Sequence, residues 1–180
     1  MKGIIFTEFL ELVEDKYGLE MVDTLIQHSE LQSKGVYTSI GTYQFSEMLS
    51  LLQNLSEGTG TSIDRLLETF AEHFFGVIER TYPDMLNAYK DPIEMLASIE
   101  NHIHVEVRKI YKDAELPSFE VLEKTSDSLV LLYKSSRSMH HFGLGLMNKT
   151  FAHFNSSASI LLEKIKEDGT EVKFFIKKKA

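Results

Sequence analysis

The sequence predicts an α+β fold in which a helical N-terminal subdomain packs on a C-terminal subdomain with a small antiparallel sheet and a helix. Apolar residues recur at helical spacing as far as Tyr111. Beyond Pro117 they form short runs that end in turn signals, which is typical of strands. The chain has 180 residues, 43% of them hydrophobic, enough for one core. We therefore expect a single domain over 1–180, with subdomains at 1–60 and 61–180.

Two helices and a loop are predicted at the N-terminus. Over 2–17 the apolar residues lie three or four positions apart among acidic ones, and Gly18 is a typical helix C-cap. A second helix is expected over 19–29. The segment 31–41 is rich in Ser, Gly and Thr, which favours a loop.

The next two helices are predicted over 44–56 and 62–80. The residues Gly58-Thr59-Gly60 separate them, because glycine disfavours the helix interior. Thr61, with Asp64 three positions later, is the expected start signal of the second of these helices.

Another helix has the clearest start in the sequence. Asp91 is a typical N-cap, Pro92 suits the first helical position, and Glu94 completes a capping box. We expect this helix to continue to about Tyr111, and Pro117 prevents any further continuation.

The remaining chain is predicted to form two hairpins around one helix. Asp168-Gly169 is a strong signal for a tight turn between two strands. The expected elements are strands Phe119–Lys124, Ser128–Ser135, Ile160–Lys166 and Glu171–Lys177, and a helix over 138–154.

Composition excludes several classes of protein. The net charge of −8 disfavours a nucleic-acid partner, which requires a basic surface. The absence of cysteine excludes disulfides, thiolate ligands and zinc sites that contain cysteine. Acidic residues interrupt the first apolar segment, so it is not a typical signal peptide, and no apolar run reaches membrane-spanning length. We expect a cytoplasmic, soluble protein without a membrane or nucleic-acid partner.

Tyr133, Ser135 and Arg137 form a candidate anion-binding motif. Alternate residues of a strand point to the same face, so the three polar side chains would form one row. Arginine makes paired hydrogen bonds with a carboxylate, and the two hydroxyl groups add more. The preceding segment 128–132 is largely apolar. The motif therefore suits a ligand with an apolar body and acidic tails, such as haem.

A haem also needs an axial ligand, and seven histidines are available: His28, His73, His102, His104, His140, His141 and His153. Helical periodicity does not choose between His102, which shares a stripe with Met95 and Ile99, and His104, which shares one with Ala97 and Asn101. A metal site built from His140, His141 and His153 has little support without a carboxylate at ligand spacing. The segment 143–145 lacks the features of a phosphate loop and suits close helix packing.

The Tyr-x-Ser-x-Arg pattern resembles the propionate-binding signature of the H-NOX (haem-nitric oxide/oxygen-binding) family, which is similar to the haem domain of soluble guanylate cyclase. Three other segments resemble the family in the same order. They are the opening Met1–Ile5, the segment His104–Tyr111, which looks like the proximal-ligand helix, and the turn Leu116–Phe119. The resemblance covers nearly the whole chain.

The resemblance implies a haem b between a distal subdomain (1–60) and a proximal subdomain (61–180). It implies that His104, rather than the alternative His102, is the proximal iron ligand. It also implies that Tyr133, Ser135 and Arg137 hold the propionates and that Pro117 presses on the haem and distorts it.

In oxygen-binding members of the family a distal tyrosine donates a hydrogen bond to the ligand, and the matching residue here is Phe142. The other residues that resemble the pocket wall, also without donors, are Ile5, Phe9, Phe74, Ile78 and Leu146. Ordinary core packing produces the same apolar pattern. The resemblance implies the branch selective for nitric oxide, and the sequence leaves open whether Tyr43 or Tyr82 reaches the pocket.

The function that the resemblance implies is gas sensing rather than catalysis, in a bacterial protein. Nitric oxide or carbon monoxide would bind a five-coordinate ferrous haem that excludes oxygen, and release of His104 would carry the signal. We expect a monomer that acts on a separate signalling protein, such as a histidine kinase or a cyclic-dinucleotide enzyme. The alternatives are a haem-free α+β interaction module and an oxygen-binding haem protein.

Overall fold

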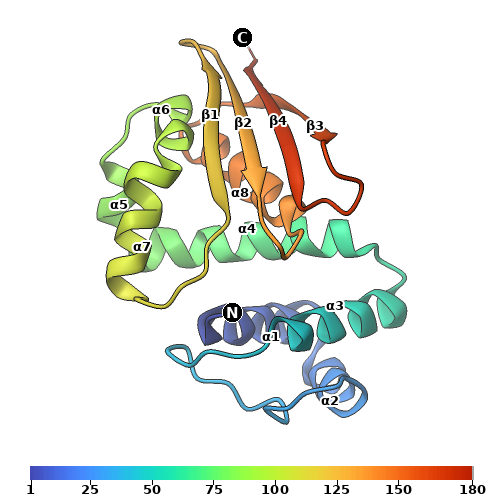
Figure 1. Cartoon of the computed structure of the whole chain (residues 1–180). Coiled ribbons are helices and arrows are strands. Elements are labelled where there is room, and N and C mark those ends of the chain that lie inside the picture. Colours follow the sequence, from blue (N-terminus) through green and yellow to red (C-terminus); the bar gives the residue numbers. More distant parts are fainter. Residues whose placement is uncertain (180) are drawn as a thin grey trace.

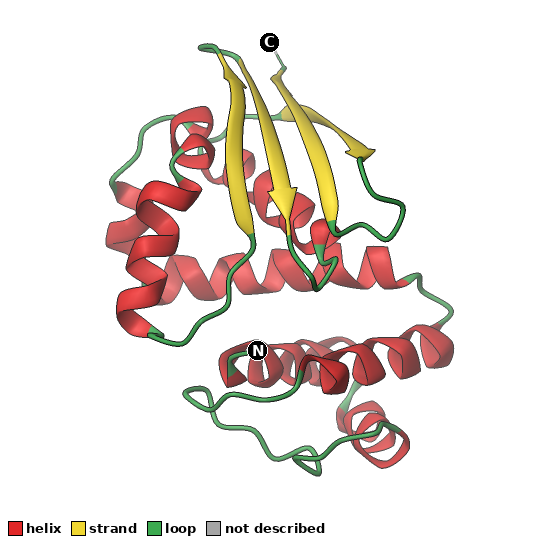
Figure 2. Cartoon of the chain, viewed as in Figure 1, coloured by secondary structure: helices red, strands yellow, loops and turns green. Residues whose placement is uncertain are grey.

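The computed structural model describes residues 1–179 and has the α+β composition that the sequence predicts (Figure 2). The N-terminal half is helical, and the C-terminal half contains the sheet. The elements in chain order are α1 Gly3–Tyr17, α2 Leu19–His28, α3 Phe45–Thr59, α4 Ile63–Thr81, α5 Pro83–Asn87, α6 Pro92–Ala97, the π-helical turn η1 Ile99–Ile103, α7 His104–Ile110, β1 Ser118–Lys124, β2 Ser128–Lys134, α8 His140–His153, β3 Ala158–Lys164 and β4 Glu171–Lys178.

Helix α4 runs through the middle of the molecule (Figure 1). Helices α1, α2 and α3 lie on one side of it, and the sheet and α8 lie on the other. The sheet has four antiparallel strands in the order β1-β2-β4-β3. Three clusters of buried apolar residues hold these layers together.

The sheet and α8 share one core, because strands β2 and β4 are apolar on the face that α8 covers. Leu129, Leu131 and Tyr133 alternate with more exposed residues along β2, as period-two geometry requires. Met147 and Phe151 of α8 belong to the same cluster. Burial of each such side chain stabilises the fold by about 1.5–3 kcal/mol before conformational entropy is subtracted.

The prediction of one continuous helix from Pro92 to Tyr111 is wrong. Helix α6 ends at Ala97, and the π-helical turn η1 precedes α7, which begins at His104. The backbone N–H groups of Ile103 and His104 bond to carbonyls five residues earlier, so the turn holds one residue more than an α-helix would. Hydrophobic spacing does not reveal such a local insertion.

Other boundaries differ by a few residues. The N-cap of α4 is Ser62, whose side chain accepts the N–H of Arg65, and not Thr61. The short helix α5 was not predicted, and Pro83 occupies its first position. Within residues 1–179 no helix is both long and apolar enough to span a membrane.

Candidate functional site

His104 lies at the start of α7 with its side chain turned inward, and only 8% of the residue is exposed. Its Nδ1 atom lies 3.1 Å from a carboxylate oxygen of Glu100, one turn earlier. Among residues 1–179 no hydrogen bond reaches its Nε2 atom. A neutral imidazole that donates from Nδ1 keeps a lone pair on Nε2, which is the arrangement of histidines that bind metals.

The electrostatics of this pair support a neutral imidazole. Burial lowers the pKa of His104, and the Glu100 carboxylate opposes that effect only in part. Burial by itself would raise the pKa of Glu100, but hydrogen bonds from the Phe119 N–H and from His104 outweigh it and leave the pKa below its ordinary value. At neutral pH the site therefore holds a carboxylate beside an uncharged imidazole.

His102, the alternative ligand, has a different partner. Its Nδ1 atom lies 2.5 Å from the Tyr89 hydroxyl, which also accepts a hydrogen bond from Ser98. This network ties the π-helical turn to the segment between α5 and α6. Of the two histidines that periodicity left open, His104 is the buried one with a carboxylate partner.

The prediction that Tyr133, Ser135 and Arg137 form one row along a strand is wrong. Strand β2 ends at Lys134, and Arg137 lies in the following turn. The Ser135 N–H still bonds to the Thr170 carbonyl, in register with the last pair of β2 and β4. The chain then turns, and the Ser135 side chain accepts the Arg137 N–H. The turn nevertheless keeps the three residues close, since the side chain of Ser135 and the charge of Arg137 both act on the Tyr133 hydroxyl.

Arg137 already binds a carboxylate. Its guanidinium donates to the Glu115 carbonyl at 2.7 Å and forms an ion pair with the Glu115 carboxylate. The Arg137 side chain is 16% exposed, whereas that of Glu115 is 81% exposed. A largely buried guanidinium with an exposed carboxylate partner fits the chemistry of a propionate clamp.

The predicted wall residues divide between two clusters. Phe9, Phe74 and Phe142 surround Phe70, with ring centroids 5.3, 5.9 and 5.1 Å from it. Sequence reasoning missed Phe70, and its spacing of four from Phe74 is the signal that could have revealed it. Ile5 packs against the same cluster. None of these side chains can donate a hydrogen bond.

Ile78 and Leu146 lie in the other cluster, together with Phe75, Met95 and Ile103. Ile103 directly precedes His104 in the chain. The structure therefore places the apolar residues of α4 and α8 beside the segment that carries His104.

The two tyrosines that the sequence left open have partners elsewhere. The Tyr43 hydroxyl accepts the Thr38 N–H at 2.8 Å, and its ring packs against Phe6 and Tyr37. Tyr82 lies beside Tyr111. Burial of Tyr111, together with the nearby Tyr82 hydroxyl, raises the pKa of Tyr111 to about 12.

Glu100 is a residue of the candidate site that sequence reasoning missed. Besides His104 it accepts the backbone N–H of Phe119 at 3.2 Å, and so it joins the π-helical turn to the start of β1. Pro117, half-buried, lies two residues before that contact. The spacing of four between Glu100 and His104 is a signal for such a pair on a helix.

Within the part of the chain that the structure describes, His140, His141 and His153 do not form one metal site. His141 bonds to Glu68, and His153 bonds to Glu79, at opposite ends of α8. His140 is buried, and neither of its ring nitrogens has a hydrogen-bond partner among residues 1–179. The prediction that the segment 143–145 serves helix packing agrees with the close approach of Gly145 to α4.

Comparisons with known proteins agree on one family. The model of the family HNOB, haem-NO-binding, matches residues 2–162. "Soluble guanylate cyclase 89Db" of Drosophila melanogaster is 26% identical over 157 residues, which are 86% of this chain but only 23% of that protein. The chain thus spans about a quarter of this curated relative.

Solved structures are similar over the whole chain. The Fe(II) unliganded H-NOX protein from K. algicida is 77% identical, with a TM-score of 0.98 over 100% of this chain and 97% of that one. The H-NOX of Shewanella woodyi, solved in the Fe(II)CO state, is 35% identical, with a TM-score of 0.84 over 99% and 95%. An H-NOX protein from S. oneidensis, 23% identical with a TM-score of 0.91 over 100% of both chains, shares the fold.

Proposed function

The chain belongs to the haem-NO-binding (H-NOX) family of haem gas-sensor domains, and from this premise we propose that it senses nitric oxide through a haem bound to His104. Haem b is the cofactor of this family, and the donors described above fit it. The observation that carries the proposal is the His104–Glu100 pair, in which a carboxylate holds Nδ1 and no described residue bonds to Nε2. When bound, haem supplies a ferrous iron that takes up a diatomic gas.

The propionates would be held by Tyr133, Ser135 and Arg137. In this proposal a propionate replaces the exposed Glu115 carboxylate on Arg137, since both are carboxylates and Glu115 is easily displaced into water. The haem would then lie between a distal subdomain, 1–60, and a proximal subdomain, 61–180. Pro117 would press on it from the proximal side, because Glu100 ties the neighbouring Phe119 to the His104 segment.

Selectivity for nitric oxide over oxygen would come from the apolar wall. A ligand that accumulates negative charge gains from a nearby hydrogen-bond donor, whereas nitric oxide gains much less. Phe9, Phe74 and Phe142 offer no donor, and Ile5, Ile78 and Leu146 extend the same apolar character. The engaged hydroxyl of Tyr43 supports this assignment.

Signalling would follow the release of His104. Helix α7 is short, and a π-helical turn precedes it, so this segment would be free to move once the ligand bond is lost. We propose a non-catalytic, monomeric, cytoplasmic bacterial sensor that also binds carbon monoxide. Its effector would be a separate signalling protein, such as a histidine kinase or a cyclic-dinucleotide enzyme.

The absorption spectrum of the reduced protein tests the proposal. It is recorded without oxygen, then in air, and then with nitric oxide. We expect a five-coordinate ferrous Soret band that air leaves unchanged and that nitric oxide shifts to the blue. A stable oxygen complex would instead favour an oxygen-binding protein, and a protein that takes up no haem on reconstitution would favour a haem-free interaction module.

A further inference from the structure

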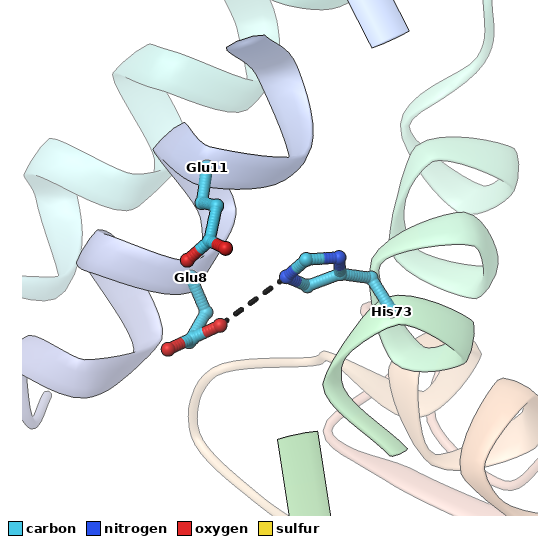
Figure 3. Close-up of side chains that lie close together, drawn as sticks. All are labelled: Glu8, Glu11 and His73. Atoms are coloured by element: carbon cyan, nitrogen blue, oxygen red, sulfur yellow. Dashed lines mark hydrogen bonds and ion pairs between the residues drawn. The ribbon is translucent and has the colours of Figure 1, made fainter. Parts of the chain in front are cut away.

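We propose that Glu8, Glu11 and His73 form a binding site for a divalent transition-metal ion, for which Zn²⁺ is the probe. Figure 3 shows both carboxylates of α1 turned toward the imidazole of α4. The three residues lie outside the candidate haem ligands and take no part in the gas-sensing proposal.

The spacing of the donor atoms suits one shared ion. One ligand atom from each residue lies within 4.8 Å of the other two. The Nε2 atom of His73 and a carboxylate oxygen of Glu8 are 3.2 Å apart. Two ligands at about 2.1 Å from a tetrahedral zinc ion lie roughly 3.4 Å apart, so this pair is already at coordination spacing. A small rotation of the exposed Glu11 side chain would complete a site with three protein ligands and room for water.

A simple ion pair accounts for only part of this arrangement. His73 bonds to Glu8, but among residues 1–179 Glu11 has neither a hydrogen bond nor an ion pair. Glu8 and Glu11 are three positions apart on one helix face, where like charges repel each other. Neither has a lysine or arginine partner within the described chain. A divalent cation would satisfy both carboxylates at once.

The chemistry of the donors favours a transition metal over calcium or magnesium. Calcium and magnesium are held by oxygen ligands, whereas an imidazole nitrogen with carboxylates suits zinc and its neighbours. His73 and Glu8 are both largely buried, with side chains 15% and 16% exposed, so two of the three ligands are already positioned.

A second histidine with two carboxylates provides a natural contrast. His141 lies 2.8 Å from Glu68 through Nδ1 and 3.3 Å from Asp64 through Nε2. Its two carboxylates face different ring nitrogens, so one ion cannot share all three residues. His141 is therefore a control that has the same residue types without the coordinating geometry.

An ion at this site would join α1 to α4. Because α1 belongs to the N-terminal helical layer and α4 crosses the middle of the molecule, the ion would stabilise the contact between the two (Figure 1). Binding to the folded state alone raises the midpoint of unfolding as the ion concentration exceeds Kd.

Isothermal titration of the purified, chelator-treated protein with Zn²⁺ tests the site. We expect one equivalent to bind, with affinity at least about tenfold lower in Glu11→Gln and His73→Gln. The matched controls Glu14→Gln and His141→Gln should bind as the parent protein does. Glu11→Gln keeps the proposal testable if His73→Gln disturbs folding, since Glu11 is exposed.

X-ray absorption at the zinc edge should then show only nitrogen and oxygen neighbours, with one imidazole. Unchanged affinity in both Glu11→Gln and His73→Gln would overturn the proposal. An equal loss in Glu14→Gln would also overturn it, because the ion would then be attracted by diffuse negative charge. A parent protein that binds no Zn²⁺ at millimolar concentration would do the same.

Discussion

Glu100 accepts a hydrogen bond from Nδ1 of His104 at 3.1 Å, across the junction between the π-helical turn and α7. A carboxylate in this position increases the basicity of the imidazole and fixes the orientation of its ring. If His104 is the iron ligand, Glu100 sets the strength of the bond that signalling must break.

Replacing Glu100 with Ala should weaken that bond. Resonance Raman spectra of the ferrous protein should show the iron–histidine stretching band at lower frequency, because the imidazole loses anionic character. Glu106→Ala is the control, since Glu106 pairs with Lys109 on the outer side of α7. An unchanged band in Glu100→Ala would show that the pair is only structural.

His104→Gly should abolish the five-coordinate ferrous spectrum, and added imidazole should restore it by filling the vacated ligand position. His102→Gly should retain the parent Soret band, because His102 is engaged by Tyr89. Absorption spectra of both reduced variants decide the assignment. Retention of the band in His104→Gly and its loss in His102→Gly would reverse the two roles.

Phe142→Tyr should introduce oxygen binding. The Phe142 ring lies 5.1 Å from that of Phe70 and 5.8 Å from that of Phe74. If this cluster forms the wall of the gas pocket, a new hydroxyl would add the donor that the wall lacks. The measurement is the spectrum of the reduced variant in air, with Phe151→Tyr as a control in the core between the sheet and α8. A variant that still ignores oxygen would contradict the placement of Phe142 over the ligand.

Acid should destabilise the protein through His140. Burial lowers the pKa of this residue, which is 5% exposed and has no hydrogen-bond partner for either ring nitrogen in the described part of the chain. The ordinary pKa of a histidine is 6.5, so below this pH the unfolded chain binds more protons at His140 than the folded chain does. This contribution to stability is complete above that pH and is lost as the pH falls, by at most about 1.4 kcal/mol per pH unit.

Urea unfolding at pH 7.5 and 5.5 measures this dependence. His140→Leu should lose less stability on acidification than the parent protein does, whereas His28→Gln, at an exposed position, should lose as much. A slope that His140→Leu leaves unchanged would assign the pH dependence to other groups.

Gly145→Ala should destabilise the fold. A Cβ atom at this position would lie 2.5 Å from the Ala71 Cβ and 2.8 Å from the Glu68 carbonyl, so α4 and α8 would have to separate. We expect a cost of about 1–3 kcal/mol in the free energy of unfolding. The double variant Gly145→Ala with Ala71→Gly should recover part of the lost stability. It removes the contact with the Ala71 Cβ but keeps the one with the Glu68 carbonyl.

Gly143→Ala is the matched control two residues earlier in α8. Its nearest neighbours, in Phe174 and Phe119, would be 3.8 and 3.9 Å from the added Cβ, which is ordinary contact. Because alanine favours the helix interior, this variant should be as stable as the parent or more stable, by up to about 1 kcal/mol. Chemical denaturation of the three variants tests both predictions. Equal losses at positions 143 and 145 would contradict the packing argument.

The sequence by itself determined the fold class and the order of most elements. Helical spacing, the caps at Gly18 and Asp91, and the Asp168-Gly169 turn are local features, so the chain carries them without any partner. The motif residues were also visible, because a resemblance depends on residue identity and order.

Only the tertiary structure decided how those residues meet. The π-helical turn before His104, the Glu100 contacts and the ion pair of Arg137 depend on segments far apart in the sequence or on a one-residue insertion. The approach of His73 to Glu8, 65 positions apart, is of the same kind. The physical reason is that such contacts form through packing of the layers around α4, and local periodicity carries no information about that packing.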